Sequence, residues 1–280
     1  MDIINLPQDL KLAPQAKLQL FNYRNEQNIQ KTKVSLSQNV ISFLRAGTKE
    51  VHGNDHSVQI NQQHFLIMKS GNCLMTEKIS ESYKSYKSIL LFFSNESVLD
   101  FLERHQLFNN KKRKSQSFYV FPYDAFIEHF VLGLEKMMLL PVATQQKILS
   151  SKFEEIMLYL SYQNHPAFLN GIIQQSDHKT SKLTTIVENN KFNKLSLDEL
   201  AFLSNMSVST FRREFFKIYQ QSPIKWFNEK RLDHIALLLK TQHKRPIELY
   251  EEAGYENFSN FVQAFKKKFG MTPKQYQVNN

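Results

Sequence analysis

Two stretches near the C-terminus repeat one another: SVSTFRREFFKIYQQSPIKWF at Ser207–Phe227 and NFSNFVQAFKKKFGMTPKQYQ at Asn257–Gln277. At an offset of 50 residues the same kinds of residue recur, namely Ser209/Ser259, Phe211/Phe261, Phe215/Phe265, Lys217/Lys267 and Pro223/Pro273. Upstream the match continues at an offset of 49, where Asn205 corresponds to Gly254. Self-similarity of this kind indicates that one supersecondary unit occurs twice.

Each copy predicts a short helix, a turn and a longer helix. Ser196 and Glu199 have the spacing of a capping box at the start of the first short helix, SLDELAFLS. Asn205 and Gly254 lie at the two turns, and both residue types tolerate left-handed backbone angles. This is the sequence form of a helix-turn-helix, whose second helix enters the DNA major groove. A helical bundle with duplicated core phenylalanines is the simpler alternative.

The segment between the copies, SPIKWFNEKRLDHIALLLKTQ, predicts a long connecting helix with Pro223 in its first turn. Its apolar positions recur at helical spacing, so they could pack against both units at once. These positions are Phe227, Leu232, Ile235, Leu238 and Leu239.

Basic residues are concentrated in the same region. The 280-residue chain has 36 Lys and Arg against 26 Asp and Glu, a formal net charge of +10. Residues 178–280 hold 17 of the basic and 10 of the acidic residues, so +7 of the surplus lies there. A basic surplus indicates a polyanionic partner, either nucleic acid or a membrane surface. Basic residues follow both turns, which favours a nucleic-acid-binding helix-turn-helix pair over a simple helical bundle.

The composition also indicates in which cellular compartment the protein is expected. Cys73 is the single cysteine, which excludes an intrachain disulfide and favours a reducing environment. The chain starts without the pattern of a signal peptide, and no stretch reaches the roughly 18 apolar residues of a membrane-spanning helix. We therefore expect a soluble, cytoplasmic protein.

The region after Val40 predicts an all-β domain. Short apolar runs alternate with turn residues, and GNDH and INQQH are plausible hairpin connections. The predicted strands are VISFLRAG, SVQIN, HFLIMKSG, CLMTEKI and YKSILLFFS. Residues 1–35 are polar and weakly periodic, which predicts an extended arm.

Helices follow the predicted strands. SNESVLDFLERH predicts a helix with Ser94 or Asn95 as its N-cap. Pro141 separates two longer helices, DAFIEHFVLGLEKMMLL and TQQKILSSKFEEIMLYLSYQ, each with an apolar stripe. The stripes comprise Ile127, Val131, Leu134 and Met138, and then Ile148, Phe153, Ile156 and Leu160. This pair could pack on the β-domain or present a face to a second subunit.

The polar stretch QQSDHKTSK predicts a domain boundary near residue 178. The expected domains are residues 1–177, with a helical segment at 124–176, and residues 178–280. The fold class is α+β: a β-barrel or sandwich with helices, followed by an all-α domain of two helix-turn-helix units joined by a linker helix.

Residues 180–277 resemble the AraC/XylS family of bacterial transcription regulators. The dipeptide RL, the segment GYENFSNFVQAFKKKFGMTPKQY and the Ser-Pro after the first recognition helix are similar to its C-terminal signature. The N-terminal part resembles the family's cupin-like regulatory domain with dimerisation helices. Within the family, GNCLMTEKI and SILLFFSNESVLDFLERH are most similar to the activators of type III secretion genes, a branch controlled through partner proteins. Tyr250 and Gln277 depart from the family pattern.

The resemblance implies DNA-contacting positions in each recognition helix. The first helix offers Ser209, Thr210, Arg212 and Arg213, with Ser207 as N-cap or phosphate ligand. Arginine can bond bidentately to guanine, although one of the two arginines is expected to touch only phosphate or water. The second helix offers Ser259, Val262 and Gln263, with Asn257 as cap or phosphate ligand and Lys267 on phosphate.

Other chemistry is weakly supported. His52, His56 and His64 lie in the β-region without the spacing of a metal site, so no metal or other cofactor is expected. The KKRK run at residues 111–114 resembles a nuclear localisation signal, but we interpret it as part of a loop or as a secondary DNA contact. Cys73 has no basic neighbour in sequence and predicts a buried thiol. No catalytic signature is visible, so the chain is not expected to be an enzyme.

The leading hypothesis is a sequence-specific transcription regulator, with activation favoured over repression by the family resemblance. Its expected partners are promoter double-stranded DNA and RNA polymerase, and no membrane. The N-terminal domain could form a homodimer and could receive a small-molecule effector or a regulatory protein. Two alternatives stay open: a cupin-type enzyme or small-molecule carrier with accessory basic helices, and a nonspecific nucleic-acid packaging protein.

Overall fold

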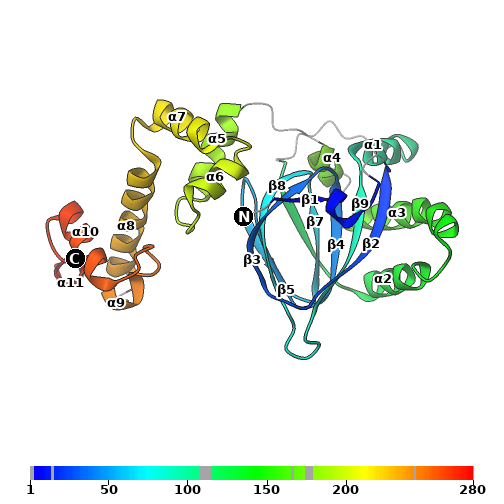
Figure 1. Ribbon diagram of the computed structural model, residues 1–280, viewed down its shortest axis with the longest axis horizontal. Coiled ribbons are helices and arrows are strands. Elements are labelled where there is room, and N and C mark those ends of the chain that lie inside the picture. Colours follow the sequence, from blue (N-terminus) through cyan, green and yellow to red (C-terminus); the bar gives the residue numbers. More distant parts are fainter. Residues whose placement is uncertain are drawn as a thin grey trace. The chain divides into compact units, whose positions relative to one another are not determined.

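The computed structural model describes residues 3–13, 16–107, 115–164, 167–173, 179–242 and 244–279 (Figure 1). The KKRK run and residues 174–178 of the boundary stretch lie outside the described residues. Compactness divides the chain into two units, Met1–His178 and Lys179–Asn280.

The N-terminal unit is built on two five-stranded sheets. Its strands are β1 (Ile4–Leu6), β2 (Leu18–Asn25), β3 (Ile29–Leu36), β4 (Asn39–Ala46), β5 (Thr48–His52), β6 (Ser57–Ile60), β7 (His64–Met68), β8 (Gly71–Lys78), β9 (Tyr86–Phe93) and β10 (Phe118–Pro122). One sheet has the order β1-β3-β8-β5-β6 and the other β10-β7-β4-β9-β2. All pairs are antiparallel except β1 with β3. The predicted all-β architecture is confirmed.

The expectation of an extended arm over residues 1–35 was wrong. That stretch supplies β1, β2, most of β3 and a 3-10 turn at Gln8–Leu10. β2 pairs with β9, in a register that sets Leu18 opposite Phe93. The local pattern is weak because β1 and β2 are edge strands with exposed polar residues, and their partners lie far along the chain.

The INQQH connection was also misread as a hairpin. β6 pairs with β5 in one sheet, whereas β7 pairs with β4 and β10 in the other, so the chain crosses between sheets at this point. GNDH does connect a hairpin, because β5 and β6 pair antiparallel on either side of it. A short polar connection has the same local sequence whether it closes a hairpin or changes sheet.

The sheet β10-β7-β4-β9-β2 is buried on both faces. Along β4, Ile41 and Phe43 belong to the core beneath the helices, whereas Val40 and Leu44 belong to the core between the sheets. Both cores need apolar side chains, which explains why β4 has apolar residues on both faces and why β9 ends in the continuous apolar run Ile89–Phe93.

Four helices form a third layer on the outer face of this sheet (Figure 1). They are α1 (Asn95–Arg104), α2 (Ala125–Met137), α3 (Val142–Asn164) and α4 (Ala167–Ile173). Ser94 is the N-cap of α1, accepting a hydrogen bond from the Ser97 backbone amide, and Asp124 caps α2 in the same way. The predicted stripes face the sheet, with Ile127, Val131 and Leu134 buried; the helical pair thus packs on the β-domain.

The described part of the C-terminal unit is helical, as predicted. Its helices are α5 (Lys179–Asn189), α6 (Leu197–Leu203), α7 (Val208–Tyr219), α8 (Pro223–Thr241), α9 (Pro246–Leu249), α10 (Phe258–Phe269) and α11 (Pro273–Val278). The capping box of Ser196 and Glu199 is present, and Pro223 occupies the first turn of α8. The five predicted apolar positions of α8 are all buried.

The sequence repeat is also a repeat of geometry. Helices α7 and α10 are both 12 residues long and begin 50 residues apart. The ring centroids of Phe211 and Phe215 are 5.8 Å apart, the same separation as for Phe261 and Phe265. Trp226 packs edge-on against Phe215 as Tyr276 packs against Phe265. Both copies therefore hold their second helix with the same aromatic frame.

Candidate nucleic-acid interface

The turn before each recognition helix depends on one left-handed residue. Asn205 has φ of 55° and Gly254 has φ of 86°. A helix that ends in this conformation reverses direction within a few residues, which lets α7 start at an angle to α6. The two predicted turn residues thus place α7 and α10 as the second helices of their units.

Three hydroxyl groups gather at the start of α7. Ser207 is the N-cap: its Oγ accepts a hydrogen bond from the Thr210 backbone amide at 3.2 Å. The same hydroxyl donates to Thr210 Oγ1 at 2.9 Å and lies 3.0 Å from Ser209 Oγ. Backbone amides and a helix dipole at this end suit an anionic group, and Ser207 and Ser209 are exposed.

Arg212 and Arg213 follow on the solvent side of α7. Phe211 and Phe215 are fully buried, and this orients the intervening arginines outward. Arg213 Nε donates to Glu214 Oε1 at 3.2 Å, and Lys217 Nζ donates to the same oxygen at 3.0 Å. Hydrogen bonds from Lys217 and then Arg213 lower the pKa of Glu214. Ion pairs this exposed are weak, so the Arg213 guanidinium can exchange Glu214 for an external partner.

The second recognition helix presents a less charged face. Asn257 is the N-cap of α10, with its Oδ1 accepting from the Asn260 amide at 2.9 Å. Ser259 and Gln263 are exposed. Val262 is half-buried and packs against the core formed by α8, α9 and α10, so only part of its side chain faces outward.

The lysines at the end of α10 divide into two groups. Lys266 and Lys267 are exposed. Lys268 instead turns back to α8, where its ammonium lies 2.7 Å from Asp233 Oδ1 and 2.5 Å from the Glu229 carbonyl oxygen. This structural role was missed in the sequence, because a run of three lysines carries no signal about which of them meets a neighbouring helix.

Arg231 of α8 is a second residue whose role was not anticipated. Its half-buried guanidinium packs against Gly254, at a point where a Cβ atom would collide with it. Burial lowers the pKa of this guanidinium. A residue with a side chain at position 254 would therefore disturb both the backbone and Arg231, which ties the linker helix to the second turn.

Tyr250 lies in the second unit directly after a first helix that is shorter than its counterpart. Helix α9 ends at Leu249 after four residues, whereas its counterpart α6 has seven. The Tyr250 ring packs edge-on against Phe258 with centroids 6.2 Å apart and contributes to the core of the second unit. The large side chain is thus accommodated between the turn and α10.

The histidines and the cysteine of the β-domain are engaged locally. His52 lies 3.0 Å from Glu50, His56 lies 3.1 Å from Asp55, and His64 Nδ1 lies 3.0 Å from Asn61 Oδ1. Within the described residues no group of three metal-ligating side chains occurs. Cys73 is buried as predicted, and burial raises the pKa of its thiol to about 12.

Two family models match the chain. One, the ExsA N-terminal regulatory domain, matches residues 39–172, and the other, a helix-turn-helix domain, matches residues 200–279. The two matches confirm the resemblance to the AraC/XylS family. The N-terminal part of the chain thus matches a regulatory domain of the ExsA type.

Similar curated proteins include transcriptional regulators. The virulence regulon transcriptional activator VirF of Yersinia enterocolitica is 28% identical over 153 residues, which are 54% of this chain and 55% of VirF. The HTH-type transcriptional regulator ExsA of Pseudomonas aeruginosa is 26% identical over 125 residues, 44% of this chain and 45% of ExsA. The match thus spans about half the length of these family members.

One solved structure that aligns with the chain is ToxT from Vibrio cholerae. It aligns over 94% of this chain and 98% of its own, with 11% identity and a TM-score of 0.41. In the part of the chain that the structure describes, none of the helices combines the length and apolar character needed to cross a membrane.

Proposed function

We propose that this protein is a sequence-specific DNA-binding transcription regulator, with residues 178–280 as the DNA-binding domain. The observation that carries the proposal is the duplicated unit: α7 and α10 repeat at an offset of 50 residues with the same capping, turn and aromatic packing. Two such helices, set one helical turn of DNA apart, would enter successive segments of one major-groove face.

Both recognition helices offer side chains that could contact bases. In α7, Ser209, Arg212 and Arg213 are the base-contacting candidates, because they are exposed beyond the buried phenylalanines. In α10 the matching positions are Ser259, Val262 and Gln263; Gln263 can pair with adenine, and Val262 can offer only an apolar contact.

Phosphate contacts are assigned to the helix starts and to one lysine. Ser207 and Asn257 cap their helices where backbone amides point toward an anion. Thr210 supports this site through its bond with Ser207, and exposed Lys267 adds a positive charge at the far end of α10. Contacts of this kind position the protein and make binding sensitive to salt.

Residues 1–177 are proposed as the regulatory and dimerisation domain. Apolar side chains stay exposed on the helical layer, with Leu139 at 79%, Val142 at 67% and Tyr162 at 87%, which supports a homodimer through α2 and α3. The name of VirF supports activation. RNA polymerase is then the expected protein partner, and the cytoplasm the expected compartment. An effector or a regulatory protein would act on this domain.

Competition binding tests the proposal. Duplexes selected from genomic fragments by the full chain should bind at least about 10³-fold more tightly than random duplexes at the same salt concentration. Equal affinity for all duplexes would instead identify a nonspecific packaging protein. If the chain binds neither selected nor random duplexes, the proposal is wrong.

A further inference from the structure

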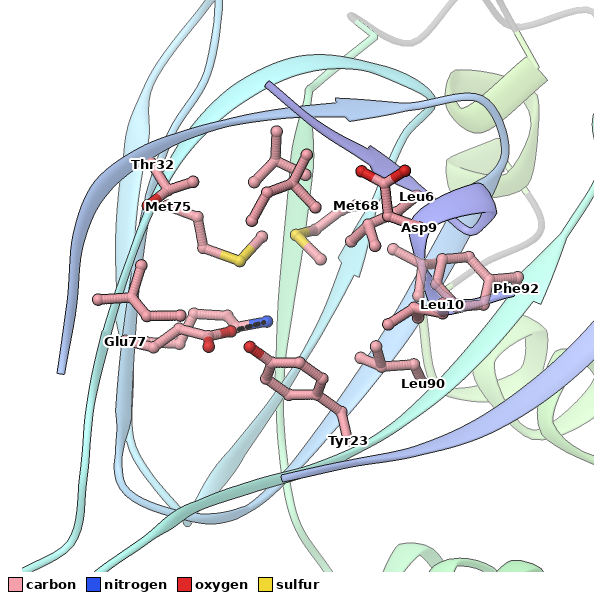
Figure 2. A pocket seen from close by; sticks show the side chains of 15 residues that line it. Leu6, Asp9, Leu10, Tyr23, Thr32, Met68, Met75, Glu77, Leu90 and Phe92 are labelled. Carbon is pink, nitrogen blue, oxygen red and sulfur yellow. Dashed lines mark ion pairs between the residues drawn. The ribbon is translucent and has the colours of Figure 1, made fainter. Parts of the chain in front are cut away.

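A cavity of about 280 Å³ lies between the two sheets of the N-terminal unit. Most of its wall is apolar and comes from both sheets, including Val34, Val40, Met68, Met75, Leu90 and Phe92. The N-terminal segment closes part of it with Leu6, Asp9 and Leu10 (Figure 2). Its volume is close to the lower end of the range of small-molecule sites.

A buried ion pair stands in this apolar wall. Lys49 is 2% and Glu77 is 3% exposed, and Lys49 Nζ lies 3.4 Å from Glu77 Oε1. The ammonium also donates to Ser42 Oγ at 3.3 Å. Figure 2 shows the Tyr23 hydroxyl directed toward the pair. Burial, then the charge of Glu77 and a side-chain hydrogen bond to it, raise the pKa of Tyr23, which keeps this hydroxyl protonated.

One oxygen of the Glu77 carboxylate lacks a hydrogen-bond donor. Glu77 Oε2 is buried and has no hydrogen-bond partner among the residues that the structure describes. A buried carboxylate oxygen without a partner is costly, because it has lost its hydration without gaining a donor. The same carboxylate faces a cavity large enough for a small molecule. A ligand that donates a hydrogen bond to Glu77 Oε2 would remove this cost.

Charge decides which kind of ligand fits. Lys49 and Glu77 already neutralise each other, and Asp9 adds a second carboxylate to the wall. An anionic ligand would meet two negative groups and compete with Glu77 for Lys49. A cationic ligand would compete with Lys49 for Glu77. An uncharged hydroxyl can donate to Glu77 and accept from Lys49 while leaving the pair intact.

We propose that this cavity binds a small, largely apolar and uncharged molecule through one hydroxyl group, which bonds to Glu77 and Lys49. The inference deepens the proposed regulatory role of the N-terminal unit and rests on that role for its biological meaning. Binding itself is measured without DNA, so absence of ligand binding and absence of DNA binding are separate results.

The first experiment compares three headgroups on one chain: 1-octanol, octanoate and octylamine at pH 7. Binding to the full chain is followed by the methyl resonances of ¹³C-labelled methionine. 1-Octanol should shift Met68 and Met75 saturably and leave Met137, which lies in the core under the helices, in place. Octanoate and octylamine should bind at least about tenfold more weakly. Equal binding of octanoate, or no shift at Met68 and Met75, would overturn the proposal.

The second experiment changes the charge of the wall. Glu77→Gln leaves Lys49 as an unbalanced cation, so octanoate should gain at least about tenfold relative to 1-octanol. Glu128→Gln is the matched control, because Glu128 is paired with Arg45 outside the cavity and its loss should leave the ranking unchanged. An unchanged ranking in Glu77→Gln contradicts the proposed role of the pair.

A third variant covers the case in which Glu77→Gln does not fold. Val34→Phe fills part of the cavity and leaves the ion pair in place. It should weaken 1-octanol binding by at least about tenfold, since the apolar volume for the chain is lost. Undiminished binding in Val34→Phe would place the alcohol elsewhere and overturn the inference.

Discussion

The two helix-turn-helix units have the same interior and different outer faces. Their phenylalanine pairs have the same centroid separation, and their left-handed turns occupy matching positions. Outside this frame they diverge: Arg212 and Arg213 of α7 correspond to Val262 and Gln263 of α10. Packing constrains the interior of both copies in the same way, whereas the outer face is free to follow whatever each unit contacts.

The largest expected effect tests whether the shared interior makes one folding unit. Phe215→Ala and Phe265→Ala each remove a fully buried ring and should each lower the free energy of unfolding by about 3–5 kcal/mol. Trp226, the single tryptophan, contacts Phe215 and reports the first unit by fluorescence during urea unfolding. Because α8 contributes to both units, both variants should move this transition. If Phe265→Ala leaves the Trp226 transition unchanged, the two helix-turn-helix units unfold separately.

The next effect concerns the outer faces. Arg213→Ala should relax base preference at one position of the selected site by about 1–3 kcal/mol, through loss of a bidentate contact. Gln263→Ala should relax a different base pair, and by less, because its unit presents fewer charged donors. Competition against singly substituted duplexes measures both. Relaxation of the same base pair by both variants would contradict the assignment of one segment to each helix.

A smaller effect separates the two turns. Gly254→Ala adds a Cβ at φ of 86° and against the Arg231 guanidinium, and should lower stability by about 1–2 kcal/mol. Asn205→Ala keeps an existing Cβ at φ of 55° and should cost less, roughly 1 kcal/mol or below. Thermal unfolding of the two variants makes the comparison. A larger loss in Asn205→Ala would show that crowding by Arg231 is not the deciding factor.

The smallest effect distinguishes two neighbouring lysines. Lys267→Ala should weaken all duplexes alike and reduce the slope of log affinity against log salt by about 0.9, as expected for one phosphate contact. Lys268→Ala should leave this slope unchanged and lower stability by up to about 1 kcal/mol, because it breaks the partly exposed pair with Asp233. DNA-binding titrations of both variants at several salt concentrations measure these slopes. Equal slopes for Lys267→Ala and Lys268→Ala would contradict the assignment of Lys267, but not Lys268, to phosphate.

Local pattern was enough to predict the helix caps and turns of both units, but not the strand pairing of the N-terminal one. The caps at Ser196 and Ser94, the turn residues and the start of α8 at Pro223 depend on neighbours within a few positions, so they are visible in the sequence. β2 was missed because its stability comes from pairing with β9, more than 60 residues away. The INQQH crossover was missed because sheet order is decided by such distant pairings.

The candidate interface shows the same division. Spacing relative to Phe211 and Phe215 predicted that Arg212 and Arg213 face outward, since helix geometry fixes which residues share a side. Spacing could not predict that Val262 is half-buried or that Lys268 bonds to α8, because both depend on where another helix lies. The cavity with Lys49 and Glu77 was not foreseen at all, because nothing near either residue in the sequence indicates burial.

By itself, the sequence determined the repeated helix-turn-helix architecture, its turns and its aromatic frame, because these follow from short-range spacing and occur twice. Only the tertiary structure decided the order of the strands, the burial of the Lys49–Glu77 pair beside a cavity and the diversion of Lys268 to Asp233. These features arise where residues far apart in the chain meet, and their energies depend on burial and pairing that no local pattern records.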